Sequence, residues 1–384
     1  MKKEIFSKIR IDFGLLMIVI LLASVSCIAI ATAQKELPSY LQSVGFVKKQ
    51  IFWYVAGAII ASLIMIFDFD QYRKICWYLY GFGMVLLIGL AVHIPGALTI
   101  KGATAWYGMG GLGNFQPSEL MKIFLILTLG HVVAKHHEEG ANTSDLRLLG
   151  KIFAVALPPT ILVLKEPDLG QALVMTAIVT AILLVSGIDW RYLLGLALAA
   201  VIFIAILAYI YFADTAFFTA HILKSYQLDR FYGWLAPYKY KTQGYQLTQA
   251  LLAAGSGGVN GISAHGQGVY FPEPHTDFIF IVVCEHFGFI GATLVISLFF
   301  LLIYRMIHTG IESNEQFGTY ICAGVIGMFT FQVFENIGMT IGLMPITGIT
   351  LPFLSYGGSS LVSYLIGAAF VMNIYSRTRS YMFE

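Results

Sequence analysis

The sequence predicts an all-α polytopic membrane protein with about ten transmembrane helices and a long, partly helical extracytoplasmic loop between the seventh and the eighth. Hydrophobic residues make up 58% of the 384 residues, and charged residues only 11%. Soluble domains carry about 25% charged residues, so this apolar excess cannot be hidden in one water-facing core. The whole chain, 1–384, is expected to form a single transmembrane domain.

Ten apolar segments are long enough to cross a bilayer, whose hydrocarbon core of about 30 Å needs roughly 20 helical residues. The fifth and sixth segments are short, and Pro158 and Pro159 interrupt the fifth, so these two could instead form one broken helical hairpin. The expected spans are 12–34, 49–68, 76–94, 118–135, 151–165, 169–187, 190–212, 278–304, 316–343 and 353–376.

Charge placement predicts that both termini are cytoplasmic. An even number of spans puts the two ends on one side, and an inside N-terminus places most Lys and Arg residues of the short loops in the cytoplasm. The polar segments 95–117, 165–168, 213–277 and 344–352 then share the outer face. The longest, 213–277, is rich in Tyr, which predicts short helices at the membrane interface. A net charge of only +2 indicates no nucleic-acid partner.

Ionisable residues inside spans are costly, so each is expected to be paired, to line a cavity or to function. Glu119 and Lys122 lie in the fourth span, Glu285 and His286 in the eighth, and Glu335 in the ninth. A rise of about 1.5 Å per helical residue places the acids and the lysine in the outer half of the bilayer. This pattern predicts a polar cavity that opens to the outer surface.

The candidate residues also have purely structural interpretations. Glu119 and Lys122 are three residues apart on one helix face and could simply neutralise each other. Asp277 stands where an acid can cap the eighth helix, while Trp106 could be an interfacial anchor. The segment 355–360 is a run of small residues that could serve close helix packing as well as substrate contact.

Three stretches of the chain carry recognisable motifs. They are GLMPITG and PFLSYGGSS within 336–360, PEPHTDFIF at 272–280 and QPSELMK at 116–122. Together they closely resemble the signature of the SEDS family (shape, elongation, division, sporulation), and the resemblance covers nearly the whole chain. Within the family, the pattern is most similar to the branch that serves cell elongation, with the division and sporulation branches as near alternatives. Two departures are Glu285-His286, where the family commonly has two adjacent acids, and 263–265, which interrupts its glycine-alternating run.

The resemblance implies a peptidoglycan glycosyltransferase that polymerises lipid II into β-1,4 glycan strands at the outer face of the bacterial cytoplasmic membrane, for cell-wall elongation and cell shape. It also implies a class B penicillin-binding protein as transpeptidase partner, with other elongation or division machinery. Asp277 matches the family's essential acid. The candidate substrate-binding residues on these motifs or beside them are Trp106, Glu119, Lys122, Glu273, Ser355 and Ser359.

The implied reaction suggests a role for each residue. An acceptor 4-hydroxyl attacks an anomeric carbon that carries a lipid diphosphate, and a base must take its proton; Asp277 is the expected base. The departing diphosphate needs cations, for which Arg230 and Lys122 are the best candidates. Glu119 would orient Lys122, and Trp106 could stack on a sugar. A divalent cation, Mg²⁺ or Mn²⁺, could share this work, although no ligand spacing in the sequence demonstrates one.

Two other functions stay open. A flippase that moves lipid II across the bilayer would suit many spans and intramembrane acids, and a non-catalytic scaffold would only recruit the transpeptidase. The sequence has no evident inverted repeat, and its intramembrane charges gather on one side of the midplane, which favours the enzyme over the flippase. A scaffold would leave those buried charges unexplained.

Overall fold

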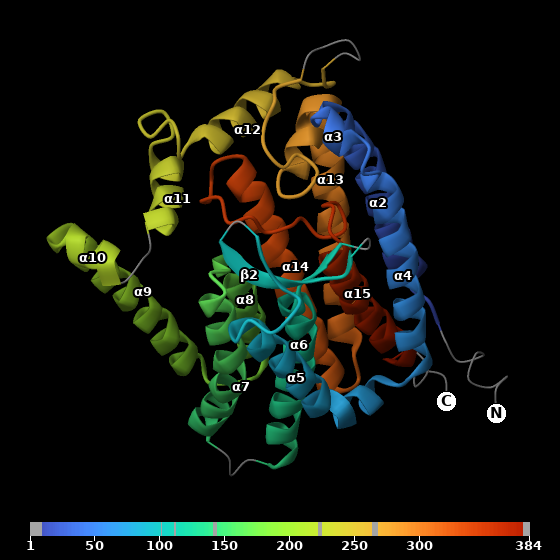
Figure 1. Cartoon of the computed structure of the whole chain (residues 1–384). Helices are drawn as coiled ribbons and strands as arrows, with labels where there is room; N and C mark the ends of the chain where they lie inside the picture. Colours follow the sequence, from blue (N-terminus) through green and yellow to red (C-terminus); the bar gives the residue numbers. More distant parts are fainter. Residues whose placement is uncertain are drawn as a thin grey trace.

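The computed structural model describes residues 10–100, 102–110, 113–140, 144–221, 225–262 and 268–378. It confirms the predicted helical membrane fold (Figure 1). Among the described helices, nine are long and apolar enough to cross a membrane, and a further expected span is the 17-residue helix α8. The helices are α2 (Phe13–Glu36), α3 (Ser39–Gln42), α4 (Phe46–Ile66), α5 (Phe69–Ala91), α6 (Pro117–Glu138), α7 (Asp145–Lys165), α8 (Leu169–Val185), α9 (Trp190–Ala213), α10 (Thr215–His221), α11 (Ser225–Leu235), α12 (Tyr245–Ser256), α13 (Ile279–Glu312), α14 (Gln316–Thr340) and α15 (Gly358–Thr378).

The fifth span is a full-length helix rather than half of a broken hairpin. α7 begins at Asp145, before the expected start at 151, and continues through Pro158 and Pro159 to Lys165. Its 21 residues are enough to cross a bilayer despite the two prolines. α8 returns beside α7 and packs against α6 and α14 (Figure 1).

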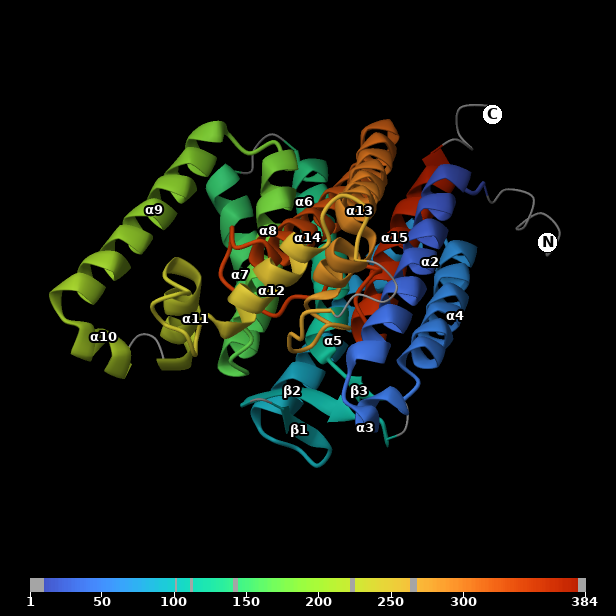
Figure 2. The same cartoon turned by 90° about the horizontal axis from the view of Figure 1, so that it is seen from above.

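Segment 95–117, which we expected only as a polar connection, contains a small antiparallel sheet. Its strands are β1 (Ala97–Ile100), β2 (Ala103–Gly108) and β3 (Asn114–Phe115), in the order β1-β2-β3 (Figure 2). Strands this short give a weak pattern next to long apolar helices. The Tyr107 hydroxyl donates to the Leu86 carbonyl at 3.0 Å and fastens β2 to α5. The sheet therefore holds Trp106, its neighbour on β2, at the end of the bundle.

A break in α13 is stabilised by a glycine-rich loop. Gly288 has φ 61° and ψ −158°, so the helix is interrupted inside an expected membrane span. The Phe289 amide donates to the Gly258 carbonyl at 2.9 Å, and the Ile262 amide donates to the Glu285 carbonyl at 2.9 Å. A Cβ on Gly261 would lie 2.0 Å from the His286 carbonyl oxygen, so only glycine permits this approach. The loop thus supplies the hydrogen bonds that a break within a membrane span requires.

The long connection between α9 and α13 is partly helical, as predicted, with α10, α11 and α12 in its described part. The interruption at 263–265 lies outside the described residues. α12 packs against α13 and α14, and the Trp234 indole donates to the Gly342 carbonyl at 2.8 Å. α9 stands away from the bundle and none of its residues is buried (Figure 2). Its apolar surface is therefore available to lipid.

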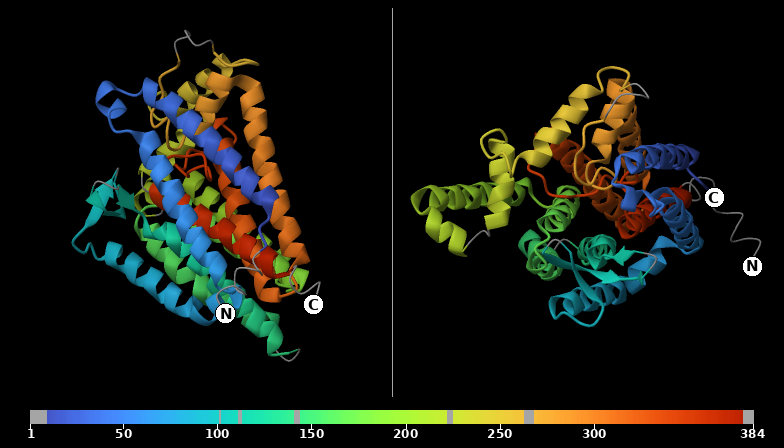
Figure 3. Two further views of the ribbon diagram at one scale, coloured as in Figure 1. Left: turned by 90° about the vertical axis from the view of Figure 1, so that its right-hand side faces the viewer. Right: turned by 45° about the horizontal axis from the view of Figure 1, so that its top comes forward.

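The connecting segments gather at one end of the bundle. Figure 3 shows the gold α12 and the blue turn of α3 at one end, and the last turns of the dark red α15 at the other. At that other end the Arg10 amide donates to the Ser376 hydroxyl at 2.8 Å, so the first and last described parts of the chain lie together. This arrangement agrees with an even number of crossings.

Candidate active site

A polar cavity of about 580 Å³ opens at the end of the bundle where the long connections meet. All four polar segments expected on one face contribute to its lining. It brings together six of the eight residues singled out from the sequence, which are Trp106, Glu119, Arg230, Glu273, Asp277 and Ser359. Lys122 and Ser355 do not line it.

Asp277 is half-buried in the turn that precedes α13. Phe278 occupies the N-cap position, so Asp277 lies just outside the helix rather than at its cap. The Asn336 side-chain amide donates to the Asp277 backbone carbonyl at 2.8 Å and fixes the turn to α14. Gly348 has φ 79°, and a Cβ there would lie 3.4 Å from Oδ2 of Asp277. Glycine therefore lets the 344–352 segment pass directly beside the carboxylate.

Arg230 is the basic side chain that lines the cavity among the described residues. It comes from α11, is exposed, and donates from Nη1 to the Thr347 carbonyl at 3.1 Å. The Thr347 hydroxyl in turn donates to Glu335 at 2.7 Å, and Glu335 is buried. The intramembrane acid of α14 thus supports a cavity wall without lining the cavity.

Glu119 and Lys122 form a buried ion pair, with Nζ and Oε2 2.8 Å apart and side chains 0% and 1% exposed for lysine and glutamate. Gln171 Nε2 donates to the other oxygen of Glu119 at 2.7 Å. The Lys122 ammonium also lies 5.8 Å from the centre of the Tyr364 ring. The mutual neutralisation considered from their spacing is therefore what the structure shows. Glu119 lines the cavity, whereas Lys122 does not line it and acts through its ion pair with Glu119.

The two serine candidates differ in their contacts. The Ser355 hydroxyl is buried, donates to the Thr276 carbonyl at 2.7 Å and accepts from the Leu351 amide at 2.8 Å. Ser355 thus braces the turn that carries Asp277 and makes no cavity surface. Ser359 lines the cavity, and its hydroxyl accepts a hydrogen bond from the backbone N–H of Gln116 at 3.1 Å.

Asp168 was not among the candidate site residues predicted from the sequence, although it lies in the polar segment 165–168 that was expected on the same face as the cavity. Asp168 lines the cavity, accepts from Gln116 Nε2 at 2.8 Å and caps α8 by accepting from the Gln171 amide at 3.1 Å. Burial raises the pKa of Asp168. Burial, together with the nearby charge of Asp168, also raises the pKa of the neighbouring Glu166 to about 8. Gln116 and Gln171, which were not singled out, line the same wall.

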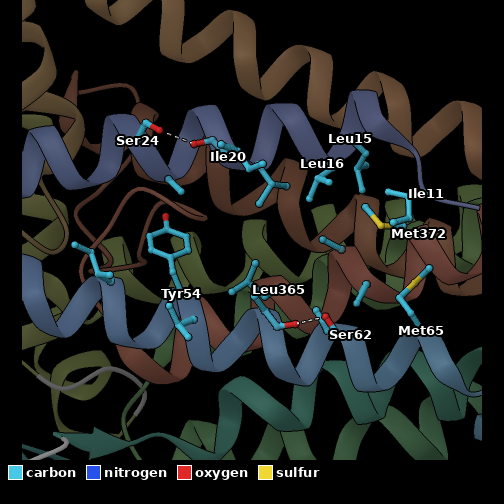
Figure 4. Close-up of a pocket in the computed structure, with 18 of the residues that line it drawn as sticks. Ile11, Leu15, Leu16, Ile20, Ser24, Tyr54, Ser62, Met65, Leu365 and Met372 are labelled. Atoms are coloured by element: carbon cyan, nitrogen blue, oxygen red, sulfur yellow. Dashed lines mark hydrogen bonds between the residues drawn. The ribbon is translucent and has the colours of Figure 1, made fainter.

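An apolar groove of about 970 Å³ runs between α2, α4 and α15 (Figure 4). Leu16, Ile20, Met65 and Met372 are among its lining side chains, and Tyr54 lies toward one end. The Tyr54 hydroxyl donates to the Phe353 carbonyl. Phe353 belongs to the connection whose next residues, from 356 to 360, line the polar cavity. Tyr54, which lines the groove, is thus hydrogen-bonded to the connection that leads into the cavity wall.

Comparison with known sequences gives extensive matches. The chain matches the FtsW/RodA/SpoVE family model, described as "Cell cycle protein", over residues 11–380. It is 33% identical over 345 residues to "Probable peptidoglycan glycosyltransferase FtsW" of Geobacter sp. (strain M18), covering 87% of this chain and 88% of the relative. It is 32% identical over 384 residues to "Peptidoglycan glycosyltransferase MrdB" of Escherichia coli (strain K12), covering 98% and 97%. "Stage V sporulation protein E" of Bacillus subtilis (strain 168) is also 32% identical over 384 residues, with coverage of 95% and 98%.

Solved structures match over nearly the full length. One, described as "Structural coordination of polymerization and crosslinking by a peptidoglycan synthase complex", has a TM-score of 0.77 at 28% identity, covering 96% of this chain and 98% of the other. The rod shape determining protein RodA of Thermus thermophilus has a TM-score of 0.67 at 27% identity, covering 95% and 97%.

A helical membrane bundle with an acid, an arginine and a tryptophan around a polar cavity at one end defines a membrane-embedded enzyme. The chain belongs to the FtsW/RodA/SpoVE family, which is the SEDS family that its motifs resemble, and it is a multi-pass membrane glycosyltransferase.

Lys122→Met should destabilise the protein by about 3–5 kcal/mol, because it leaves a buried carboxylate without its counter-charge. Glu119→Gln should cost a similar amount, and the double variant should regain much of the loss. A double-mutant cycle on thermal unfolding in detergent measures this coupling. Lys151→Met is the matched control, since its exposed pair with Glu139 is worth about 0–1 kcal/mol. Additive losses in the cycle would contradict the pairing.

Proposed function

We propose that this glycosyltransferase polymerises lipid II into β-1,4 glycan strands, with Asp277 as the general base. The supporting observation is the position of the Asp277 carboxyl group in the same cavity as Trp106 and Arg230. A cavity of about 580 Å³ is of the size that holds small ligands. In this proposal the cavity takes the sugar units and leaves the lipid tails to apolar surfaces of the membrane spans.

The reaction requires a carboxylate that accepts a proton and a cation that stabilises the negative charge of the leaving group. The acceptor 4-hydroxyl attacks the anomeric carbon with inversion, and Asp277 takes its proton as the new bond forms. Arg230 lies on the cavity wall where its planar guanidinium can meet the departing diphosphate in bidentate fashion. Trp106 provides an aromatic face for a sugar ring. Glu119 and Lys122 were expected to bind substrate. Their buried ion pair instead supports the part of the cavity wall that Glu119 lines.

A divalent cation such as Mg²⁺ or Mn²⁺ would supply further positive charge for the diphosphate. Asp168 and Glu273 both line the cavity, and carboxylate oxygens are the ligands these ions prefer. We propose Asp168 and Glu273 as the residues that would hold it.

Asp277→Asn should abolish glycan synthesis, with a loss of at least about 10²-fold, because the amide cannot accept the proton. The assay uses purified protein with fluorescent lipid II, with and without a class B penicillin-binding protein, and detects glycan ladders on a gel. Asp229→Asn is the matched control: Asp229 accepts from Gln243 at 3.3 Å and does not line the cavity.

Equal ladders from Asp277→Asn and the native chain would remove Asp277 from the base role. Movement of lipid II across the bilayer without any glycan ladders would favour the flippase. If the native chain showed neither activity, only the scaffold function would remain. An unchanged melting temperature of the variant shows that lost activity is not lost folding.

We further propose that the apolar groove holds a polyprenyl tail of a substrate. Ala58→Trp would fill the groove from an exposed position on α4 and should raise the KM for lipid II with a full-length tail several-fold. Lipid II with a shortened tail should be affected little. Val201→Trp on α9, which is exposed and outside the groove, is the control. An equal effect on both substrates would place the tail elsewhere.

The proposed orientation puts the cavity outside the cytoplasmic membrane and both termini in the cytoplasm. A cysteine at Tyr238, which is 74% exposed in the α11–α12 connection, should react with an impermeant thiol reagent added to intact cells. A cysteine at Leu146, exposed at the start of α7 on the opposite end, should react only after permeabilisation. The reverse pattern would invert the topology.

We assign the enzyme to cell elongation and cell shape, acting with a class B penicillin-binding protein and other wall-synthesis machinery. The likeness to RodA over 95% of the chain, and to a structure described as a peptidoglycan synthase complex, supports this assignment. Depletion of the protein in its host should give rounded cells. Filaments with unfinished septa would instead assign it to division.

A further inference from the structure

Outside the polar cavity, one cluster of three side chains joins two distant parts of the chain. Glu36 comes from the last turn of α2, and Glu285 and His286 come from α13 just before its break at Gly288. Glu36 Oε1 lies 2.8 Å from Nε2 of His286, and Glu285 Oε2 lies 4.0 Å from the same nitrogen. None of the three lines the polar cavity.

The fully buried carboxylate of Glu285 has one oxygen satisfied and one not. Its Oε1 accepts from the Val269 amide at 2.6 Å. Its Oε2 is buried and accepts no hydrogen bond from any residue that the structure describes. A buried, uncompensated carboxylate oxygen is costly, and a cation beside it removes that cost. This oxygen lies 4.0 Å from Nε2 of His286, and one carboxylate oxygen of each glutamate lies within 4.8 Å of the other ligand atoms of the cluster.

We propose that Glu36, Glu285 and His286 form a binding site for a divalent transition-metal ion, of the class of Mn²⁺ or Zn²⁺. One imidazole nitrogen with two carboxylate oxygens is a donor set that such ions accept, whereas Mg²⁺ and Ca²⁺ prefer oxygen alone. Ligands about 2.0–2.2 Å from an ion lie about 3–4 Å apart. The 4.0 Å separation of Glu285 Oε2 and His286 Nε2 lies at the upper end of that range, whereas Glu36 and His286 make a direct hydrogen bond of 2.8 Å that a bound ion would replace. Side-chain exposures of 25% for Glu36 and 19% for His286 leave the ion a path in.

The site would brace the chain that leads into the catalytic turn. The Val269 amide bonded to Glu285 belongs to the segment that runs on to Glu273 and Asp277. A Cβ on Gly268 would lie 2.4 Å from Glu36 Oε1, so this segment passes directly over the cluster. An ion held here joins α2, α13 and that segment, and the Val269 hydrogen bond orients one of its ligands from behind.

Mn²⁺ binding to the full-length protein in nanodiscs, without lipid II, tests the site. Electron paramagnetic resonance should detect one tightly bound Mn²⁺ per chain, and pulsed measurements should show the nitrogen modulation of one imidazole ligand. His286→Gln should remove that modulation, and Glu36→Gln, which changes a partly exposed side chain, should weaken binding at least about tenfold. His308→Gln is the matched control, because His308 pairs with Glu312 on the same helix at 3.2 Å without a third ligand among the described residues.

Asp168→Asn should bind Mn²⁺ as the native chain does, which separates this site from an ion held by Asp168 and Glu273 in the polar cavity. Competition by Zn²⁺ but not by equal Mg²⁺ is expected. Absence of tight Mn²⁺ binding, nitrogen modulation that survives in His286→Gln, or unchanged affinity in Glu36→Gln would each overturn the proposal.

Discussion

The position of the Asp277 carboxyl group, the proposed general base, depends on one buried amide. Asn336 lies fully buried in α14, and its Nδ2 donates to the carbonyl of Asp277 at 2.8 Å and to that of Ile349 at 2.7 Å. These two bonds bring the turn before α13 and the connection before α15 to a single point. A buried hydrogen-bonding group left without its partner costs about 1–3 kcal/mol, so the two segments are strongly held together. Asn336 achieves this without lining the cavity.

Several polar residues of the membrane spans act in the same way, as supports beneath a polar surface. Glu335 holds Thr347, whose carbonyl receives Arg230, and Lys122 neutralises Glu119. Polar networks in a low-dielectric interior stabilise only when their members are satisfied. A cavity built on such supports is preorganised, which is what stabilisation of a developing charge requires. Placing these charged groups in the bilayer costs free energy, but their hydrogen bonds and ion pairs fix the positions of the residues that line the cavity.

The polar cavity and the apolar groove lie in separate parts of the molecule. The cavity lies where four connecting segments meet, and the groove lies between α2, α4 and α15 along the membrane spans. A substrate with a sugar head and a prenyl tail needs both surfaces at once. The break of α13 at Gly288 adds a third feature, because the glycine-rich loop that satisfies it holds the long connection close to the bundle.

The sequence alone was sufficient to predict the helical membrane fold, the partly helical loop and the family, because hydropathy sums over consecutive residues and motifs are local. It also predicted a polar cavity beside the charges of the spans, and the structure has a polar cavity at one end of the bundle. Of the ionisable residues predicted within the spans, however, only Glu119 lines it, whereas Trp106, Arg230 and Asp277 reach it from connecting segments. Only the tertiary structure decided that Lys122 faces Glu119 and that Ser355 braces a turn. It likewise revealed the sheet before α6. The Ser355 hydrogen bond joins residues 79 positions apart, so no local pattern of residues encodes it. The ion pair and the sheet are local, but spacing alone left the pairing of Glu119 and Lys122 as one of two interpretations, and strands this short give too weak a pattern to be predicted.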